Sequence, residues 1–199
     1  MDYKTYHYGD NGISDNGWGC SYRNIQTIIS CYKKYNNPSV IIPTLPEILR
    51  FFKKNIKSSK SRELWIEPYD IARYLNFFDN KLMGNHYVYV TNDTDFSKIL
   101  KTDVSFYLND NLIINDFSKL YSIIKQHFKN TKLPVVIDDG VFSYCFTLND
   151  NKDNNKNNNN KDTILLIDPH QPDNPVQVKT LGFLKNRFWM IFFPYSIGI

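Results

Sequence analysis

Cys20 combines a reactive side chain with a position that can activate it. It follows Gly-Trp-Gly at 17–19 and precedes a helix-like pattern, which places it at the expected N-terminal end of a helix. The positive end of a helix dipole stabilises a thiolate, the nucleophilic form of cysteine. The glycines on both sides of Trp18 permit a tight turn and the close approach of a substrate backbone. The alternative, a buried structural thiol, is our interpretation of Cys31 and Cys145, which lie in apolar runs.

A cysteine nucleophile needs a base that later protonates the leaving group, and a third residue that orients the base. His170 is the candidate base, because it follows the sequence LLID at the expected exit of a strand. Residues i and i+2 of an extended segment point to the same side, and Pro169 restricts the backbone between them. We therefore expect Asp168 to orient the imidazole of His170. The alternative is an ordinary Asp-Pro turn with an exposed histidine.

The other histidines have less suggestive surroundings. His7 flanks the cysteine loop, His86 opens an apolar strand, and His127 lies on a polar helix face, so each is expected to have a structural or surface role. Cys20 precedes His170 by a spacing close to the roughly 130–150 residues that papain-like proteases show between nucleophile and base.

The elements that must position these residues follow from hydrophobic periodicity. Between Ser21 and Lys34 the apolar residues recur at the spacing of one face of an amphipathic helix. Further helices are expected after Thr44, from Pro68 and after Asn115 or Asp116. The β-type runs are 86–91, 133–138, 141–148, 163–168 and 187–194. Because most helices come first and most strands later, an α+β fold with a largely antiparallel sheet is predicted.

Composition and charge exclude several classes of protein. A chain of 199 residues, 42% of them hydrophobic, suits a single catalytic domain over 1–199. The net charge is +4 and the lysines are scattered, so nucleic-acid binding has little support. No apolar run approaches the roughly 20 residues that cross a bilayer, so direct membrane insertion is not expected. The first residues lack a secretory pattern, and a cytoplasmic or nuclear location is expected.

Three cysteines without CxxC spacing or a nearby histidine pair argue against a disulfide scaffold and a zinc site. We expect neither a metal nor an organic cofactor. Residues 149–162, NDNKDNNKNNNNKD, contain no apolar residue and predict an Asn-rich disordered loop between two strands. The basic run at 53–62 is interpreted as a helix end that leads into a solvated loop, with a surface for an acidic partner as the alternative.

The stretch YHYGDNGISDNGWGCSYRNIQTI at 6–28, together with DPH at 168–170, resembles the proteases specific for ubiquitin-fold modifier 1. These are papain-like cysteine proteases. Looser matches extend the resemblance over nearly the entire chain, in the order of the family's short form. They are IPTLPEI at 42–48, RELWIE at 62–67, LPVVI at 133–137 and LLIDPH at 165–170.

The resemblance implies a papain-like fold and a role for each matched residue. Cys20 matches the family's nucleophile, while Asp168 and His170 match its Asp-Pro-His pair. Tyr8 matches the tyrosine assigned to the oxyanion hole. There a phenol can donate a hydrogen bond to the developing oxyanion, alongside a backbone N–H at the helix start.

The resemblance also implies the substrate, which is the extended C-terminal tail of ubiquitin-fold modifier 1, cleaved after a Val-Gly end. Precursor maturation and removal of the modifier from lysines are the two implied reactions. The implied partners are therefore the precursor and its protein conjugates. Separately from the resemblance, we expect a monomer. A narrow channel between aromatic walls suits a terminal glycine. Trp18 and Trp65 match family tryptophans near this cleft and are interpreted as cleft-wall or packing residues.

The chain departs from the family pattern on segments expected beside the site. Where members often have a glycine-rich segment followed by Ala-His-Thr, this chain has Asp138, Asp139 and Tyr144. The sequence WMIFFP at 189–194 replaces Tyr-Asn-Leu-Cys-Leu-Pro, and the preceding Gly-Trp pair is reduced to LGFL at 181–184. These changes concern substrate fit and rate more than the chemistry.

Two other functions remain open. Autophagins, which process the lipid-conjugated autophagy modifier, also carry Gly-Trp-Gly-Cys and Asp-Pro-His and share the mechanism. The upstream Tyr-His-Tyr and the residues that follow Cys20 favour the first family. The second alternative is a catalytically weak homologue that binds the modifier without cleaving it. The altered strand at 138–145 motivates that alternative, and the complete set of matched catalytic residues argues against it.

Overall fold

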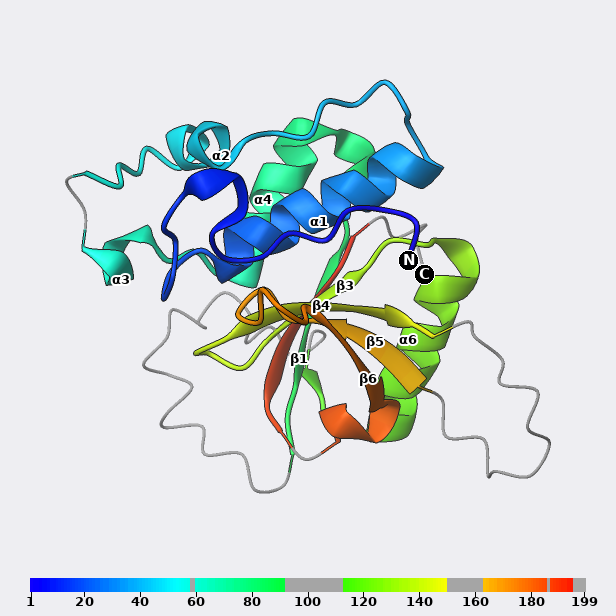
Figure 1. The fold of residues 1–199 in the computed structure, drawn as a ribbon. Coiled ribbons are helices and arrows are strands. Elements are labelled where there is room, and N and C mark those ends of the chain that lie inside the picture. The colour runs from blue at the N-terminus through cyan, green and yellow to red at the C-terminus, as the bar shows by residue number, and fades with distance from the viewer. Residues whose placement is uncertain (58–59, 92–112, 150–162, 186, 195–199) are drawn as a thin grey trace.

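A computed structural model describes residues 1–57, 60–91, 113–149, 163–185 and 187–194. Within these ranges the chain forms a seven-stranded sheet in the order β2-β1-β7-β3-β4-β5-β6, with helices on both faces (Figure 1). Neighbouring strands in the described part of the sheet are antiparallel, except that β1 and β2 are parallel. The expected α+β fold with a largely antiparallel sheet is confirmed.

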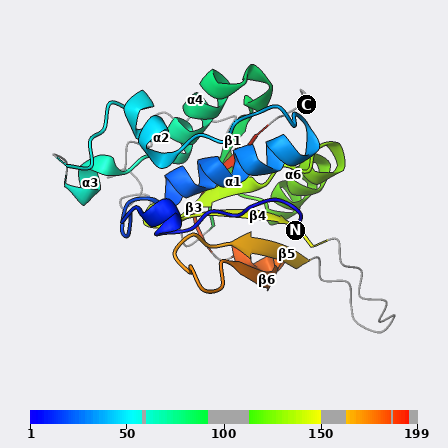
Figure 2. The same ribbon diagram turned by 45° about the horizontal axis from the view of Figure 1, so that its top comes forward.

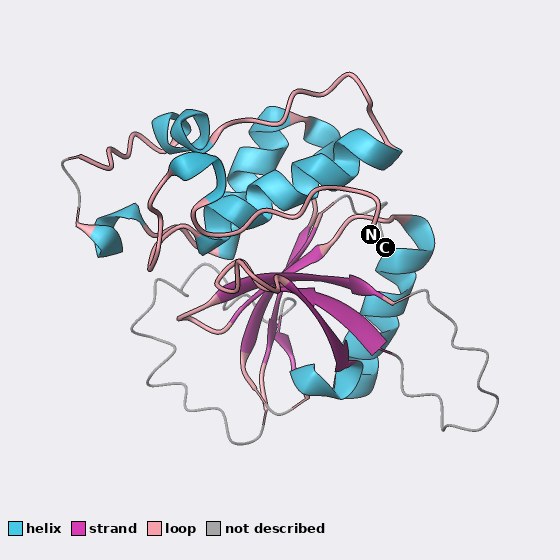
Figure 3. Cartoon of the chain, viewed as in Figure 1, coloured by secondary structure: helices cyan, strands magenta, loops and turns pink. Residues whose placement is uncertain are grey.

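The elements follow one another in an irregular alternation of helices and strands (Figure 3). The helices are α1 (Cys20–Tyr35), α2 (Leu45–Phe51), α3 (Ser61–Leu64), α4 (Pro68–Phe78) and α6 (Phe117–Asn130), with short 3-10 helices η1 (Asp10–Gly12), η2 (Asn80–Leu82) and η5 (Leu181–Leu184). The strands are β1 (Asn85–Tyr89), β2 (Ile113–Ile114), β3 (Val135–Asp138), β4 (Ser143–Leu148), β5 (Thr163–Ile167), β6 (Val176–Thr180) and β7 (Trp189–Phe193).

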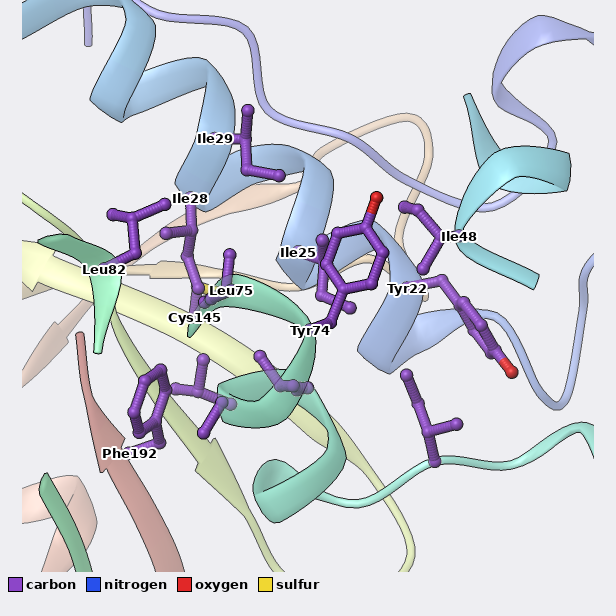
Figure 4. Packing of buried hydrophobic residues seen from close by; sticks show 14 of the residues in the cluster. Tyr22, Ile25, Ile28, Ile29, Ile48, Tyr74, Leu75, Leu82, Cys145 and Phe192 are labelled. Carbon is purple, nitrogen blue, oxygen red and sulfur yellow. The ribbon is translucent and has the colours of Figure 1, made fainter. Parts of the chain in front are cut away.

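The helix α1 packs on one face of the sheet and contributes the centre of the larger core. Ile25 and Ile28 are fully buried and belong to the same cluster as Cys145 of β4 and Phe192 of β7 (Figure 4). Helices α2 and α4 complete this layer, with Leu75 of α4 in the same cluster. Burial of one such aliphatic side chain stabilises the fold by about 1.5–3 kcal/mol. This packing fixes the position of α1, and therefore of its first residue, against the sheet.

The opposite side of α1 is also buried. The sequence predicted an amphipathic helix with only one buried face, so this second buried side is a difference from the prediction. Residues 21 to 32 of the helix are all buried. The N-terminal segment runs along the outer side of α1, where the backbone N–H of Tyr6 donates to Thr27 Oγ1 at 3.0 Å. The N–H of Lys4 donates to Ser30 Oγ, also at 3.0 Å. Hydroxyl side chains on this side therefore satisfy the backbone of the segment that covers them.

The second face of the sheet carries α6 (Figure 2). Leu120 and Ile124 of this helix are fully buried against sheet residues such as Ile137 and Phe146. The helix begins where the sequence predicts, because the Asp116 side chain accepts a hydrogen bond from the N–H of Ser118 at 2.8 Å.

Two antiparallel pairings bring the C-terminal half of the chain together. Strand β3 pairs with β4, and Asp138 lies opposite Ser143 in that register. Strand β4 pairs with β5, as expected for strands that flank the Asn-rich segment. Residues 150–162 of that segment lie outside the described residues.

Some short elements were not predicted from the sequence, namely α3, β2, β6 and the 3-10 helices. Strand β6 is an edge strand with partly exposed residues, and Val178 is 62% exposed, so the strand lacks a continuous apolar run. Among the described residues, no helix combines the length and apolar character needed to cross a membrane.

Candidate active site

Cys20 is the first residue of α1 and is partly buried. The turn before it depends on a close backbone approach to Asp15, whose carbonyl accepts hydrogen bonds from the N–H groups of Trp18 at 3.2 Å and Gly19 at 2.8 Å. A Cβ atom on Gly19 would lie 2.1 Å from Asp15 Oδ2, so the tight turn requires glycine at this position. The prediction that Cys20 lies at a helix N-terminus is confirmed.

A fully buried ion pair supports the loop that precedes Cys20. Arg23 Nε donates to Asp15 Oδ2 at 2.7 Å, and both side chains are 0% exposed. The second carboxylate oxygen of Asp15 accepts from the N–H of Gly9 at 2.8 Å. The Arg23 guanidinium also donates to the Asp10 carbonyl and to Gln26 Oε1, each at 3.0 Å. These charge-assisted bonds fix the loop onto the first turns of α1.

His170 and Asp168 lie together in the loop between β5 and β6. His170 Nδ1 is 2.6 Å from Asp168 Oδ1, which also accepts from the backbone N–H of His170 at 3.0 Å. The expected pairing is therefore present, but not through an extended segment. The chain turns after Ile167, and the N–H of Gln171 donates to the Asp168 carbonyl at 3.2 Å. The Asp168 side chain accepts the backbone N–H of His170 and so stabilises this turn. The prediction from the sequence placed the two residues on one side of an extended strand and did not include a turn.

The hydrogen bond to Asp168 determines which nitrogen of His170 is left for another partner. An ionised carboxylate can only accept, so Nδ1 donates and Nε2 is left for another partner. Nε2 is buried and makes no hydrogen bond of ordinary geometry among the described residues, although Cys20 interacts with the ring. Burial favours a lower pKa for the imidazole, but hydrogen bonding and charge from Asp168 and Cys20 raise it to about 9. Cys20 is therefore one of the groups that stabilise the protonated form of the ring.

Three aromatic rings enclose the His170 imidazole. Their centroids lie 5.0 Å away for Tyr8, 4.9 Å for Phe142 and 5.4 Å for Tyr144, and all three contacts are edge-to-face. The backbone N–H of Tyr8 donates to the Pro169 carbonyl at 2.9 Å, which attaches the N-terminal segment to the histidine loop (Figure 2). These contacts restrict the orientation of the ring.

The Tyr8 hydroxyl lies near the candidate nucleophile. Burial raises its pKa well above the usual range, and charge and hydrogen bonding from Cys20 raise it further. A hydrogen bond from the backbone of Gly17 acts in the opposite direction. The phenol therefore stays protonated at neutral pH and keeps a proton to donate.

The two tryptophans assigned near the cleft differ in their surroundings. Trp18 is 5% exposed and packs edge-to-face on Tyr22 in the core, which matches the packing alternative. Trp65 is 44% exposed, and its Nε1–H donates to the Gly17 carbonyl at 2.6 Å. Trp65 thus presents an aromatic surface beside the loop that carries Cys20.

The remaining histidines have partners other than Cys20 and Asp168. The prediction of a polar helix face for His127 was wrong, because the side chain is buried and its Nε2 bonds the Leu133 carbonyl at 2.8 Å. Burial lowers the pKa of both His86 and His127 to about 4. His7 bonds the Tyr8 carbonyl at 2.9 Å. Within the described ranges, no group of His, Cys, Asp and Glu side chains could hold a metal ion.

Several features of the site were missed by reasoning from the sequence. No sequence pattern indicated the Asp15–Arg23 ion pair, because the spacing of two charged residues does not reveal that both are buried together. The positions of Phe142 and Tyr144 against His170 were also missed. The departure of segment 138–145 from the family pattern was the available signal, since it marked this hairpin as lying beside the site.

The fold is papain-like, with the candidate nucleophile at the N-terminus of α1. The model of peptidase family C78 matches residues 1–190. The chain belongs to this family.

Individual relatives agree with this assignment. Ufm1-specific protease 2 from Rattus norvegicus is 31% identical over 149 residues, which cover 71% of this chain and 26% of that protein. A probable Ufm1-specific protease from Oryza sativa subsp. japonica is 40% identical over 86 residues, covering 41% of this chain and 13% of that protein. The crystal structure of UfSP from C. elegans matches 98% of this chain and 33% of its own, with a TM-score of 0.61 and 21% identity. This likeness shows the fold, and the chain spans a third or less of these relatives.

Proposed function

We propose that this chain hydrolyses the bond after the C-terminal glycine of Ufm1, both in the precursor and in conjugates on lysine. Membership of the C78 family supports the peptidase chemistry, and the names of the similar relatives support the modifier. The observation that carries the proposal is the geometry of His170. Its Nδ1 is bonded to Asp168 at 2.6 Å, which leaves Nε2 for the interaction with Cys20 that raises the pKa of the imidazole.

In the proposed reaction the Cys20 sulfur attacks the glycine carbonyl carbon as a thiolate, paired with protonated His170. The carbonyl oxygen becomes negative and accepts hydrogen bonds from the Tyr8 hydroxyl and from the backbone N–H of Cys20 at the start of α1. When the C–N bond breaks, Nε2 of His170 gives its proton to the leaving amine. A thioester between Cys20 and the modifier remains.

In the second half of the reaction, hydrolysis of the thioester, His170 accepts a proton instead of donating one. Neutral His170 accepts a proton from water through Nε2, and the resulting hydroxide attacks the thioester carbonyl. The modifier leaves with a free C-terminal carboxylate, and the thiolate of Cys20 is regenerated beside protonated His170. Asp168 keeps the imidazole in the required tautomer through both halves.

The substrate tail is proposed to pass between aromatic side chains near the thiol. Trp65 is exposed beside the carbonyl of Gly17, and Phe142 is 45% exposed while packing on His170. Flat aromatic surfaces on either side of an extended chain favour glycine, because a side chain at the cleaved residue would collide with them. This supports cleavage after glycine.

A C-terminal electrophile tests the proposal directly. Ufm1 that carries a propargyl group in place of its last carboxylate should add covalently to Cys20, with the labelled peptide identified by mass spectrometry. Cys20→Ala should abolish labelling and turnover of a C-terminally extended Ufm1 but still bind it. Cys31→Ala, which changes a fully buried thiol, is the matched control and should retain labelling.

Other outcomes separate the alternatives. Turnover by Cys20→Ala would remove Cys20 from its role. Processing of an autophagy-modifier precursor, but not of extended Ufm1 in a parallel assay, would identify an autophagin-type specificity. Binding of Ufm1 by the unmodified chain, without labelling of Cys20, would identify a modifier-binding protein that does not cleave.

A further inference from the structure

A buried polar pair lies where the β3–β4 hairpin turns, at the end of β3 and the start of β4. Asp138 is 8% exposed and Ser143 is 0% exposed, and they face each other across the two strands. The Ser143 hydroxyl donates a hydrogen bond to the Asp138 carboxylate, which also accepts from the N–H of Gly140 at 2.7 Å. Gly140 has φ +87°, so the hairpin turns at a left-handed position that favours glycine. The carboxylate of Asp138 thus holds the hairpin closed.

The same pair extends to the helix that carries Cys20. Asn24 is 1% exposed, and its Nδ2 donates to Ser143 Oγ at 2.9 Å. Asn24 lies four residues after Cys20, on the same side of α1 and one turn further along. A serine hydroxyl donates once and accepts twice, so the bonds have one consistent direction. They run from the Asn24 amide to the Ser143 hydroxyl and on to the Asp138 carboxylate.

The hairpin also contacts the candidate base. Phe142 and Tyr144, on either side of Ser143, place their ring centroids 4.9 and 5.4 Å from that of His170. The hairpin therefore contacts α1 through Ser143 and the imidazole through its two aromatic neighbours. A shift of Ser143 changes both contacts together.

We infer that Asp138, Ser143 and Asn24 are positioning residues, which hold the helix that carries Cys20 in register with the hairpin that packs on His170. This inference rests on the proposed roles of Cys20 and His170. None of the three side chains is placed to react with a substrate. They influence catalysis indirectly, because they set the distance between the Cys20 thiol and the His170 imidazole. Proton transfer depends on that distance.

The charge on Asp138 decides whether this chain of hydrogen bonds is complete. Burial raises the pKa of Asp138 to about 7, the hydrogen bonds from Gly140 and Ser143 lower it, and the charges of Asp139 and Glu67 raise it. Arg187, before β7, lies 3.9 Å from Asp139 and offsets part of that charge. A protonated Asp138 must donate to an acceptor, and donation to Ser143 would leave the Ser143 hydroxyl hydrogen without one. The complete arrangement therefore belongs to the ionised carboxylate.

The test measures how fast iodoacetamide alkylates Cys20 as a function of pH, with each peptide resolved by mass spectrometry. The alkylation rate should increase with pH, with an inflection near pH 7 where the Asp138 carboxyl group ionises. Asp138→Asn should remove this inflection and lower the rate at pH 8 by up to about 100-fold, the cost of a small misplacement in a catalytic site. Asn mimics the protonated acid, because its amide also donates toward Ser143.

Two further variants should move the inflection in opposite directions. Ser143→Ala removes a hydrogen bond that lowers the pKa of Asp138, so the inflection should shift to higher pH. Asp139→Asn removes a charge that raises this pKa, so the inflection should shift to lower pH. Asn at 139 keeps the oxygen that accepts from the N–H of Phe142 at 2.8 Å, so the hairpin is expected to fold. Val141→Ala, at a 58% exposed position of the same hairpin, should leave the inflection unchanged.

The outcomes separate this inference from the proposed function. If Cys20 reacts no faster than an ordinary exposed thiol, the proposed function fails and the inference fails with it. If Cys20 reacts rapidly but the inflection does not move in Ser143→Ala or in Asp139→Asn, only the inference is overturned. Circular dichroism on each variant confirms that the rates refer to folded protein. If Asp138→Asn or Ser143→Ala does not fold, the shift in Asp139→Asn alone decides.

Discussion

The surroundings of a cysteine, more than its residue type, decide whether it can react. Burial raises the pKa of the Cys31 thiol to about 12 and that of Cys145 well above its ordinary value, so both stay protonated inside the core. Cys20 is instead partly exposed at the start of α1 and interacts with the His170 ring. The sequence context predicts the burial of Cys31 and Cys145, which lie in apolar runs, and it places Cys20 after a glycine-rich turn.

Asp168→Asn tests how far the carboxylate controls the base. Asp168 raises the pKa of His170, which is about 9, so the variant should have a lower imidazole pKa. The imidazolium then loses its proton at lower pH, and the alkaline limb of the kcat/KM profile should move in the same direction. We expect kcat to fall on the order of 100-fold or more, because Asn does not hold the tautomer required for general acid–base catalysis.

The control for this experiment is Asp173→Asn, a change of an exposed acid in the same loop. It should leave both limbs of the profile in place. An unchanged alkaline limb in Asp168→Asn would show that another group sets the pKa of His170.

Tyr8→Phe separates the hydroxyl of Tyr8 from its ring. The ring contact with His170 at 5.0 Å can persist, while the donor to the proposed oxyanion is lost. The kcat for cleavage should fall by about 10²–10³-fold, the usual cost of removing one such donor. Alkylation of Cys20, which forms no oxyanion, should change little. Equal losses in cleavage and alkylation would instead indicate that the phenol positions the thiol.

At the scale of elements, the sequence predicts best where local chemistry determines the structure. Helix α2 begins at the predicted capping box, in which Thr44 and Glu47 bond each other's backbone N–H groups. Strand β6 was missed because its position at the sheet edge removes the apolar pattern. The predicted exposure of His127 was wrong because the segment after α6 folds back and its Leu133 carbonyl bonds that side chain. Such contacts depend on tertiary structure and leave no periodic signal.

Part of the candidate site was predictable from local sequence, whereas the residues that support it were not. The Asp168–His170 pair and the place of Cys20 at a helix start follow from residue type and order along the chain. Asp15 and Arg23 look like ordinary loop and helix charges in the sequence, yet both are fully buried. A residue's burial depends on the whole fold, so a single sequence does not reveal it.

Arg23→Met tests the support of the cysteine loop by α1. The variant leaves the buried carboxylate of Asp15 without its cation, so the free energy of unfolding should fall by about 3–5 kcal/mol. Urea denaturation measures this change. The matched control is Lys4→Ala, which removes an exposed partner 3.8 Å from Asp10 and should cost less than about 1 kcal/mol. Similar losses in both variants would show that the buried pair contributes no more than a surface contact.

At the scale of the molecule, the candidate site is assembled from two layers. Cys20 belongs to the helical layer, whereas Asp168 and His170 follow a strand of the sheet. The Asn24–Ser143 bond at 2.9 Å is a polar contact between the two layers. The hydrophobic core between α1 and the sheet also holds the two layers together, and with them the helix end that carries Cys20.

Ile28→Ala tests this dependence, because Ile28 is fully buried in the core between α1 and the sheet (Figure 4). The lost burial and the cavity left behind should lower the free energy of unfolding by about 2–5 kcal/mol. Ile41→Ala, at an 81% exposed position, should change it by less than about 0.5 kcal/mol. The temperature at which Cys20 loses its rapid alkylation should fall together with the Tm of Ile28→Ala, since the thiol and the imidazole separate when the layers do. Rapid alkylation that survives above the Tm would show that the helix end alone activates Cys20, without the sheet.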